Sequence, residues 1–456
     1  MINFTFSERI LDISIPLDYD YLMKRDIYQH LLAWKQSELR QPLVLRGARQ
    51  VGKTFILKEF AKNEYDNYVY LNFEDDSTLD AFFASRFDKE RIINYLSIYS
   101  GGVKIIPGRT LIIFDEIQAS NNALNSLKYF NENGNDYHIA AAGSLLGIKL
   151  SGQKSFPVGQ VTFLDLYPLS FLEFLDALEK AGLRQLITGS GREFISFPES
   201  FHIELLDILK YYYYTGGMPQ VVNTFRQTRD FEGARKVQQD IVDAYLLDFA
   251  KHAEKSLVMK ISGIWESIPV HLSKENKKFI FSVVRKGARA REYEEALQWL
   301  FDAGLIYKCY NITRPGIPLR SYADTNIFKV YLLDIGLLGA ITKLAPDSII
   351  KGNSIFTHFY GALVENYVVQ QLRWKFPGEM YYWTSPGKAE VDFVFSVNDR
   401  VYPLESKAGV NPHSKSLKVY EEKYNPDMLS RTNLLNLKKD GKTCNYPLYA
   451  ISLFPL

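Results

Sequence analysis

The sequence predicts an α/β protein in which a doubly wound parallel sheet is followed by helices, a winged-helix-like segment and a small α/β domain. Three observations predict this fold class. Short apolar runs typical of buried strands alternate with helical patterns over the first 165 residues. Helical patterns then dominate, until a helix, a strand, a Pro- and Gly-rich loop and a second strand follow one another around residue 310. From about Tyr360 a long helical pattern precedes three strand-like runs.

The length of the chain requires more than one hydrophobic core. A single core does not grow to 456 residues, and domains usually contain about 100 to 200 residues. We expect the sheet domain at residues 1–165, a helical lid or connector at 166–255, the winged-helix-like domain at 256–350 and the small α/β domain at 351–456.

The composition is that of a globular protein, with 46% hydrophobic and 23% charged residues. A formal net charge of +2 neither indicates nor excludes a nucleic-acid partner. Cys309 and Cys444 lack the spacing of metal ligands and favour a reducing compartment. Acidic residues interrupt the first 20 residues, where a signal peptide needs an apolar core, and no apolar run approaches about 18 residues. We therefore predict a cytoplasmic protein with no membrane partner.

The first domain is predicted from a strand, a glycine-rich loop and a helix in direct succession. The letters PLVLRGARQVGKT lead into FILKEFAKN, where apolar residues recur at helical spacing. Three more apolar runs, at residues 68–73, 110–114 and 138–142, are short enough for buried parallel strands. Strands separated by helical stretches indicate a doubly wound sheet.

The glycine-rich loop matches the pattern G-x-x-x-x-G-K-[ST] at every position, between a predicted strand and a predicted helix. Glycines let the backbone approach a phosphate closely, and N–H groups of the loop and the helix point toward the anion. The ammonium of Lys53 adds charge at the β- and γ-phosphates, and the hydroxyl of Thr54 is placed to ligate Mg²⁺. The predicted nucleotide-binding loop consists of Gly47, Ala48, Arg49, Gln50, Val51, Gly52, Lys53 and Thr54.

Paired carboxylates end the strand at residues 110–114 and supply the partner that this loop needs. Asp115 is predicted to hold the Mg²⁺ shell, and Glu116 to orient and deprotonate the attacking water. Ser144 ends the next strand, where it either touches the γ-phosphate or the water, or caps a helix. The acidic residues 74–76 are expected in a solvated loop rather than at the metal.

Several polar and aromatic residues elsewhere have an ordinary structural interpretation. Arg46 and Arg49 are expected on the surface, with contact to nucleotide or to an interface as the alternative. The four tyrosines at residues 211–214 are expected to pack a helix end before a Gly-Gly turn, rather than to stack on bases. Asp248 and Lys251 have helical i, i+3 spacing and are expected to form a surface ion pair.

Charged residues interrupt the strand-like runs near the carboxyl end of the sequence. Glu405 and Lys407 are two apart in a predicted strand and share a face, with Asp392 on the neighbouring strand. Two carboxylates can hold Mg²⁺ or Mn²⁺ beside a lysine that orients water, and Glu365 on the preceding helix is a fourth candidate. This set suits metal-dependent cleavage of a phosphodiester. Salt bridges on exposed strand edges explain the same residues.

These motifs together resemble bacterial and archaeal AAA+-type ATPases in which a P-loop domain precedes a domain of unknown function with a restriction-endonuclease-like end. The resemblance covers nearly the whole chain and rests on RGARQVGKT, LIIFDEIQ, AAGSLLG, FPVGQVTFLDLYPLSFLEFL, YYTGGMPQVV, FKVYLLDIGLL, GALVENYVVQQL, EVDFVF and LESKAG. It implies ATP hydrolysis at the nucleotide-binding loop, Asp115 and Glu116, and a PD-(D/E)XK-type core on Asp392, Glu405 and Lys407. The chain departs from relatives at Gln160, where they often carry Lys or Arg, and at Ser406, where a small apolar residue is usual.

Two functions remain open from the sequence. The first is Mg²⁺-dependent ATP hydrolysis coupled to a winged-helix and nuclease-like domain acting on double-stranded DNA. The alternative is a nucleotide-switched binding or regulatory protein with slow turnover and an inactive nuclease-like domain. A homo-oligomer or a protein partner is compatible with both.

Overall fold

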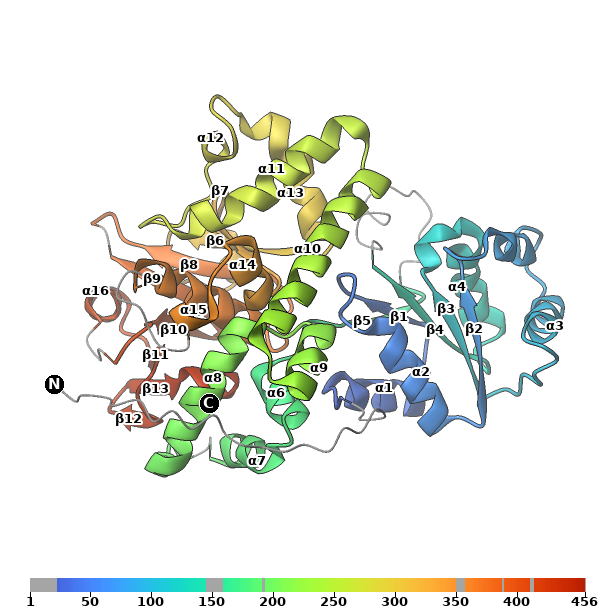
Figure 1. The fold of residues 1–456 in the computed structure, drawn as a ribbon, viewed down its shortest axis with the longest axis horizontal. Helices are drawn as coiled ribbons and strands as arrows, with labels where there is room; N and C mark the ends of the chain where they lie inside the picture. The colour runs from blue at the N-terminus through green and yellow to red at the C-terminus, as the bar shows by residue number, and fades with distance from the viewer. Residues whose placement is uncertain are drawn as a thin grey trace.

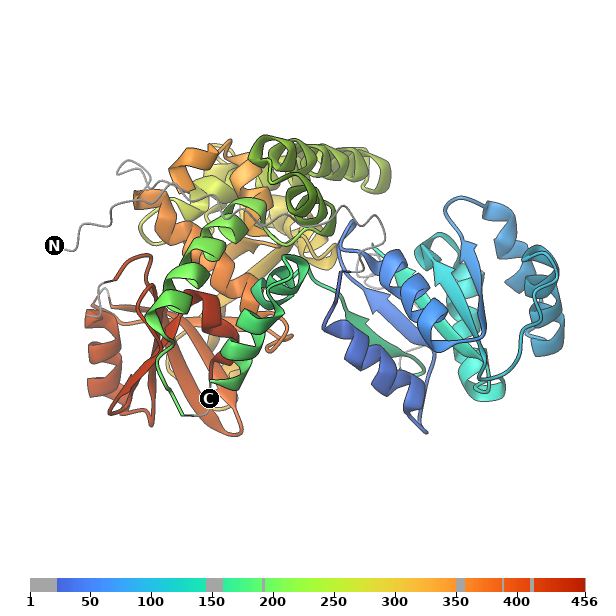
Figure 2. The same cartoon turned by 60° about the horizontal axis from the view of Figure 1, so that its bottom comes forward.

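The computed structural model describes residues 23–144, 159–190, 193–349, 357–387, 389–410 and 414–455, with the side chains of 357–359 excepted. The start of the chain, on which the signal-peptide argument rests, lies outside these residues, as do parts of the AAGSLLG and FPVGQV motifs. Figures 1 and 2 show the first sheet, in blue to green, toward one end of the molecule and a second sheet, in yellow to red, toward the other. In the described part, no helix is both long and apolar enough to cross a membrane.

The first sheet is parallel throughout, with the order β2-β3-β4-β1-β5. Its strands are β1 (Leu43–Arg46), β2 (Asn67–Asn72), β3 (Thr110–Asp115), β4 (His138–Gly143) and β5 (Thr162–Asp165). The predicted strands are confirmed. The sequence TFLD of β5 does not predict a strand, because it is short and does not alternate apolar and polar residues.

Helices cover both faces of the first sheet, as expected for a doubly wound fold. Alternate strand residues enter opposite cores, so that Leu45 and Ile113 belong to one core and Val44 and Ile112 to the other. The elements around the sheet are α1 (Ile27–Gln36), α2 (Lys53–Glu64), η1 (Ser77–Phe83), α3 (Lys89–Tyr99), η2 (Ile117–Ala119) and α4 (Asn121–Asn133).

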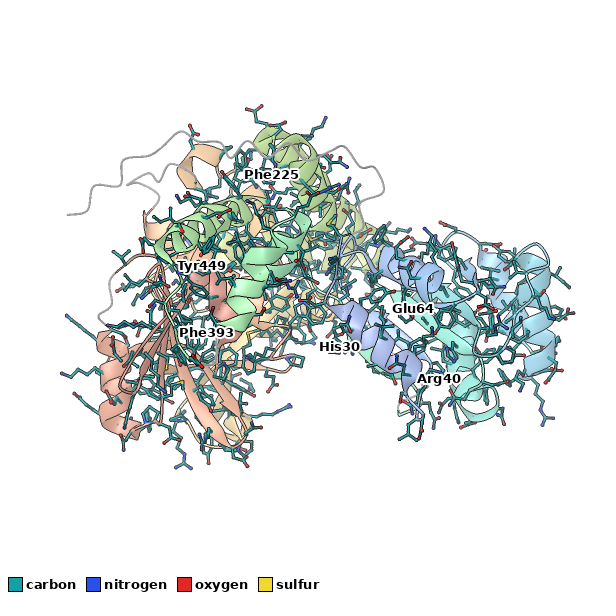
Figure 3. All side chains as sticks on the ribbon, turned by 90° about the horizontal axis from the view of Figure 1, so that it is seen from below. His30, Arg40, Glu64, Phe225, Phe393 and Tyr449 are labelled. Atoms are coloured by element: carbon teal, nitrogen blue, oxygen red, sulfur yellow. The ribbon has the colours of Figure 1, made fainter. Side chains whose placement is uncertain are left out.

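Helices follow the first sheet, as predicted. They are α6 (Phe171–Ala177), α7 (Ala181–Gly189), α8 (Glu199–Thr215), α9 (Pro219–Thr228), α10 (Phe231–His252) and α11 (Lys255–Leu272). Tyr212, Tyr213 and Tyr214 are buried, which confirms their predicted packing role. The helices also contact the end of the chain, because His202 Nδ1 lies 2.7 Å from the hydroxyl of Tyr449, which is labelled in Figure 3.

The second sheet has eight strands in the order β12-β13-β11-β10-β9-β8-β6-β7. The predicted winged-helix-like segment supplies α12 (Phe281–Val284), α13 (Ala290–Asp302), β6 (Ile306–Ile312), η3 (Leu319–Tyr322), β7 (Ala323–Leu332) and α14 (Ile335–Ile341). The last segment supplies α15 (Thr357–Leu372), β8 (Met380–Thr384), β9 (Glu390–Val397), β10 (Arg400–Ser406), α16 (Lys415–Tyr424), β11 (Leu429–Asn433), β12 (Lys438–Asp440), β13 (Thr443–Pro447) and η6 (Leu448–Leu453). Because β6 pairs with β8, the boundary expected at residue 350 does not divide this sheet.

Four of the family-like motifs meet at one buried joint between the helices and the second sheet. Asp334 begins α14 and accepts hydrogen bonds from Gly217 N at 2.6 Å and Gln370 Nε2 at 2.8 Å. The hydroxyl of Tyr212 donates to Leu169 O and accepts from Gln370 Nε2 at 3.0 Å. A Cβ atom at Gly217 would lie 2.1 Å from Leu169 O, so the turn can only approach this closely with glycine.

Candidate nucleotide site and carboxylate cluster

The glycine-rich loop connects β1 to α2 at the carboxyl edge of the first sheet. A Cβ atom at Gly47 would lie 2.2 Å from Leu166 O, which explains the first glycine. Gly52 has a φ of 95° and precedes the first residue of α2. Both glycines of the pattern are therefore required by the backbone path, and the N-terminus of a twelve-residue helix follows them.

Lys53 is folded back into its own loop. Its Nζ donates to Gly47 O at 2.9 Å and to Ala48 O at 2.8 Å. Burial lowers the pKa of Lys53 to about 8, against the opposing effect of the carboxylates of Glu116 and Asp115. The ammonium therefore lies at the centre of the loop.

Asp115 is held by neutral hydroxyl groups. Its Oδ2 accepts from Thr54 Oγ1 at 2.7 Å and from Tyr70 OH at 2.8 Å. Among the described residues, no lysine or arginine forms an ion pair with Asp115. Thr54 and Asp115 thus place two oxygen atoms of the kind that Mg²⁺ prefers next to each other, so the donor set fits this metal.

Glu116 and Ser144 lie beside Asp115, at the ends of adjacent strands. Glu116 has a left-handed φ of 48°, and its Oε2 accepts from Gln118 Nε2 at 2.5 Å. Ser144 Oγ lies 3.4 Å both from Glu116 Oε2 and from Arg49 Nε. The structure therefore brings Ser144 to the loop and to Glu116. Residues 145–158 lie outside the described part, so the helix-cap alternative stays a prediction.

Arg49 links the loop to α10 and to the end of β2. Its guanidinium pairs with Asp248 and, at 2.9 Å, with Glu74, while Arg49 O accepts from Tyr245 OH at 2.8 Å. Lys251 also pairs with Glu74. The ion pair predicted between Asp248 and Lys251 is thus replaced by two longer-range pairs, and Glu74 does not lie in a merely solvated loop. Sequence spacing missed these contacts because their partners are distant in the chain.

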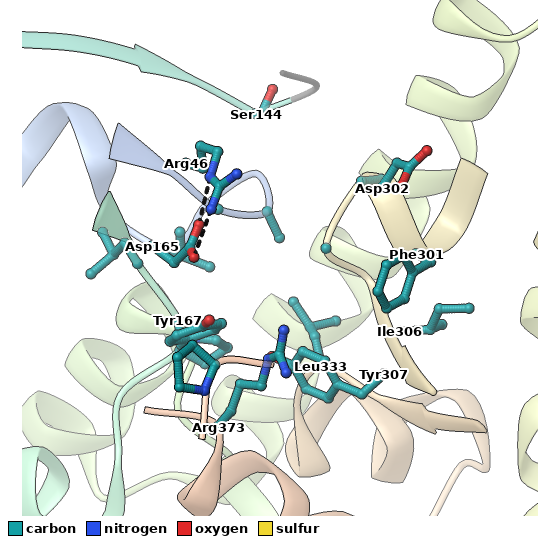
Figure 4. Close-up of a pocket in the computed structure, with 18 of the residues that line it drawn as sticks. Arg46, Ser144, Asp165, Tyr167, Phe301, Asp302, Ile306, Tyr307, Leu333 and Arg373 are labelled. Carbon is teal, nitrogen blue, oxygen red and sulfur yellow. Dashed lines mark hydrogen bonds and ion pairs between the residues drawn. The ribbon is translucent and has the colours of Figure 1, made fainter. Parts of the chain in front are cut away.

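A cavity of about 240 Å³ lies between the first sheet and the turn from α13 to β6 (Figure 4). Arg46 lines it and forms two hydrogen bonds with Asp165, of 2.8 and 2.9 Å. Arg373 points into it from the end of α15, and a Cβ atom at Gly304 would lie 3.6 Å from Ala48 N. The second half of the chain therefore touches the nucleotide-binding loop directly.

Arg25 is a buried contact of the loop that sequence analysis did not identify. Its guanidinium donates to Val51 O at 3.0 Å and to Tyr167 O at 2.6 Å, and it pairs with Glu173 at 3.1 Å. Glu173 also forms a capping box with Ser170 at the start of α6. The sequence signal was weak, because Arg25 precedes the motif by more than 20 residues.

Asp392 lies on β9 and Glu405 on β10, and Lys407 directly follows β10. Asp392 Oδ2 accepts from Ser406 N at 2.8 Å and from Ser406 Oγ at 3.0 Å. Glu405 pairs with Lys407 at 2.6 Å and accepts from Ser414. Burial and the nearby carboxylates of Glu365 and Glu405 raise the pKa of Asp392 to about 7, although lysines oppose this effect. We call these residues, with Glu365, the carboxylate cluster.

Glu365 is engaged by two ammonium groups. It pairs with Lys277, pairs with Lys329 at 3.5 Å and accepts from Tyr331 OH at 2.8 Å. Burial raises the pKa of Glu365, but the two lysines outweigh burial and bring it to about 2. Lys329 is itself buried and also pairs with Glu390 at 2.6 Å. Among the described residues, no three acidic, histidine or cysteine side chains are arranged to hold a metal ion, and the metal roles of Asp392, Glu405 and Glu365 stay predictions.

Three family models match separate parts of the chain. Residues 39–175 match an AAA domain, residues 206–348 match a domain of unknown function (DUF8612), and residues 360–451 match another (DUF4143). No curated protein matches the sequence. Residues 39–175, which include the glycine-rich loop and all five strands of the first sheet, are thus similar to an AAA domain, and this match supports the P-loop part of the resemblance.

Several solved structures are remotely similar to the chain. A Walker-type ATPase of Pyrococcus abyssi is 15% identical, with a TM-score of 0.43 over 70% of this chain and 96% of that chain. The ORC1 protein of Aeropyrum pernix in complex with DNA is 13% identical, with a TM-score of 0.30 over 74% of this chain and 96% of that chain. Drosophila ORC bound to DNA is 11% identical, with a TM-score of 0.29 over 70% of this chain and 94% of that chain.

Proposed function

We propose that the AAA domain binds ATP with Mg²⁺ and hydrolyses it, and that its nucleotide state is transmitted to the winged-helix-like segment and the nuclease-like end. The observation that carries this proposal is the hydrogen bond of 2.7 Å between Thr54 Oγ1 and Asp115 Oδ2, beside a loop closed around Lys53. A hydroxyl and a carboxylate in this position serve a divalent cation and the phosphates that it accompanies.

Each residue of the nucleotide site has a separate role in hydrolysis. Loop N–H groups and Lys53 bind the phosphates, and Glu116 accepts the proton of the attacking water. Ser144, whose Oγ lies 3.4 Å from Glu116 Oε2, orients either that water or the γ-phosphate. Thr54 and Asp115 would hold Mg²⁺, which when bound neutralises charge on the phosphates.

Arg49 provides the route by which the nucleotide acts on the rest of the chain. A triphosphate competes with Asp248 and Glu74 for its guanidinium, and so loosens α10 from the loop. The same helix reaches the buried joint, where Gln238 Nε2 donates to Tyr214 O at 2.9 Å and to Thr215 O at 2.8 Å. Movement of α10 would therefore shift the Gly216–Gly217 turn, which contacts Asp334.

Measurement of nucleotide affinity and phosphate release on one set of variants tests this proposal. Lys53→Ala should abolish binding of a fluorescent ATP analogue, and Glu116→Gln should keep binding but lose release. If Glu116→Gln releases phosphate at the wild-type rate, while Lys53→Ala no longer binds nucleotide, the chain is instead a nucleotide-switched binding protein with slow turnover.

A second candidate function is metal-dependent cleavage of double-stranded DNA at the carboxylate cluster, which requires that Lys407 leaves Glu405 when metal and DNA bind. The observation behind it is that Glu405 ends β10 next to Ser406, which donates to Asp392 of β9, and that Lys407 Nζ lies 2.6 Å from Glu405 Oε1. Incubation with a plasmid, ATP and Mg²⁺ or Mn²⁺ tests it. Cleavage should disappear in Asp392→Ala and persist in Asp399→Ala, a matched change in the turn after β9. Cleavage that survives Asp392→Ala eliminates this function.

A further inference from the structure

A strongly basic segment lies away from the nucleotide site. Residues 274–291 read KENKKFIFSVVRKGARAR and contain seven lysines and arginines but one acidic residue, although the whole chain carries a net charge of only +2. The segment joins α11 to α13 through α12, at an edge of the molecule remote from the first sheet (Figure 1). We call it the basic segment.

Most of the positive charge of the basic segment is exposed and has no acidic partner among the described residues. Of its seven basic side chains, Lys277 pairs with Glu365, whereas the other six form no ion pair with any described acidic residue. Four of these six are exposed, namely Arg285, Lys286, Arg289 and Arg291. Like charges this close repel one another, and a polyanion removes that repulsion.

Positive charge is also unfavourable in the first turn of α13. Arg289 occupies the N-cap without a side-chain cap, and Arg291 lies in the first turn, which also contains Glu292. Ser, Thr, Asp or Asn is favoured at this cap, and a basic group there opposes the helix dipole. The two arginines therefore destabilise the start of the helix. A negatively charged partner bound there would offset this cost.

The basic segment is held in place by packing on β7. The ring of His271 stacks on Phe279 with 4.4 Å between the ring centroids, and its Nδ1 and Nε2 lie 2.9 and 3.0 Å from the carbonyl oxygens of Ser267 and Ile280. Phe279 N donates to Phe328 O at 2.9 Å, and the two phenylalanine rings also stack. The surface therefore needs little reorganisation on binding.

We infer that the basic segment binds the phosphate backbone of double-stranded DNA. Single strands are usually held by stacking on exposed aromatic rings, but Phe279 is buried and Phe281 is half-buried and packed against it. A helix that binds a membrane surface inserts a free apolar face, whereas α12 has four residues and the apolar face of α13 is buried in the protein core. Arginine and lysine side chains without base-stacking groups suit a duplex backbone.

The basic segment is also continuous with the carboxylate cluster. Lys277 leaves the same segment to pair with Glu365, and its charge acts on Asp392. A duplex on the segment would therefore lie close to the second candidate site. Binding itself rests neither on ATP turnover nor on cleavage, so it goes beyond the function proposed above.

Fluorescence anisotropy of a labelled DNA duplex with the full chain, without nucleotide, tests the inference. The variant Arg285→Gln/Arg289→Gln/Arg291→Gln should bind about tenfold more weakly, and the slope of log affinity against log salt should fall by about 0.9 for each lost phosphate contact. The control Arg86→Gln/Lys104→Gln/Arg109→Gln removes three exposed charges from the AAA domain and should bind within about twofold of wild type.

Equal weakening in the two triple variants, or none in either, overturns the inference. Tighter arginine-dependent binding to single-stranded DNA, duplex RNA or anionic phosphatidylserine vesicles overturns the choice of duplex DNA. Thermal unfolding and ATP-analogue binding check that the triple variant is folded, and the single variants Arg285→Gln and Arg289→Gln replace it if it is not. Failure of ATP hydrolysis in Lys53→Ala leaves the expected DNA affinity unchanged, so the two proposals fail separately.

Discussion

Acidic side chains gather in both the nucleotide site and the carboxylate cluster, but their charge is balanced in different ways. Asp115 accepts hydrogen bonds from the hydroxyls of Thr54 and Tyr70, at 2.7 and 2.8 Å. In the carboxylate cluster Glu365 faces two lysines, and Glu405 pairs with Lys407 at 2.6 Å. Neutral donors leave a carboxylate free to attract a cation, whereas an ammonium already supplies one.

The difference teaches that acidic residues alone do not define a metal site. A buried ion pair has a large desolvation cost, and loss of one partner leaves an unpaired buried charge. A cation that enters the carboxylate cluster must therefore displace or reposition lysines. At the nucleotide site a cation and its phosphates arrive together, and the cation can reach Asp115 by replacing the hydrogen bond from Thr54, without the loss of an ion pair at Asp115.

The largest expected effect comes from breaking the nucleotide site at Lys53. Lys53→Ala removes the ammonium that fills the loop and should lower ATP turnover about 10³-fold, because phosphate charge loses its buried cation. Steady-state phosphate release measures this loss. Lys62→Ala, on the exposed side of the same helix, should keep the wild-type rate, and an equal loss there would contradict a specific role for Lys53.

Breaking the charge balance of the carboxylate cluster should affect stability instead. Lys329→Met leaves Glu390 and one side of Glu365 without their buried cation and should cost about 3 to 4 kcal/mol in the free energy of unfolding. Urea denaturation measures it. Lys438→Met removes an exposed pair with Asp440 and should cost less than about 1 kcal/mol. Equal costs would show that burial of Lys329 is not what matters.

Glu116→Gln sharpens the comparison by separating binding from chemistry. The amide keeps the size of the side chain but cannot accept a proton, so turnover should fall about 10²-fold while affinity for an ATP analogue stays unchanged. Single-turnover phosphate release and equilibrium binding on the same sample give both values. A matched loss of affinity would place Glu116 in nucleotide binding.

The pH dependence of stability should reveal the environment of Asp392. Its pKa is raised to about 7, so the folded state binds this proton more tightly than the unfolded state, and the stability it contributes is lost as pH rises from about 4 through 7. Asp392→Asn keeps an acceptor for Ser406 N and removes the charge. It should therefore stabilise the chain by about 2 kcal/mol at pH 8 and by little at pH 4. A difference that grows toward low pH would contradict this assignment.

The smallest effect is expected where the two halves of the chain meet at Arg49. Asp248→Asn weakens the ion pair that holds Arg49 on α10 and should tighten ATP-analogue binding about threefold. Asp243→Asn, an exposed change on the same helix, should have no effect. Weaker nucleotide binding in Asp248→Asn would mean that this contact supports the loop rather than competing with phosphate.

Features that depend on neighbours in sequence could be predicted, and those that depend on distant contacts could not. The loop, its flanking strand and helix, and the acidic end of β3 follow from local pattern and chemistry. The ion pairs of Lys329, which lies in an apolar run, could not be predicted, because its partners Glu365 and Glu390 come from other elements. The sharing of one sheet by β6 and β8 likewise depends on pairing across a long connection.

Anomalous scattering from crystals grown with Mn²⁺ and a non-hydrolysable ATP analogue tests the central difference between the two acidic sites most directly. The charge balance predicts a Mn²⁺ ion between the phosphates, Thr54 and Asp115, and none beside Asp392 and Glu405 while Lys407 keeps its ion pair. Mn²⁺ bound at the carboxylate cluster with all its lysines in place, or absent from Asp115 when the nucleotide is bound, would contradict it.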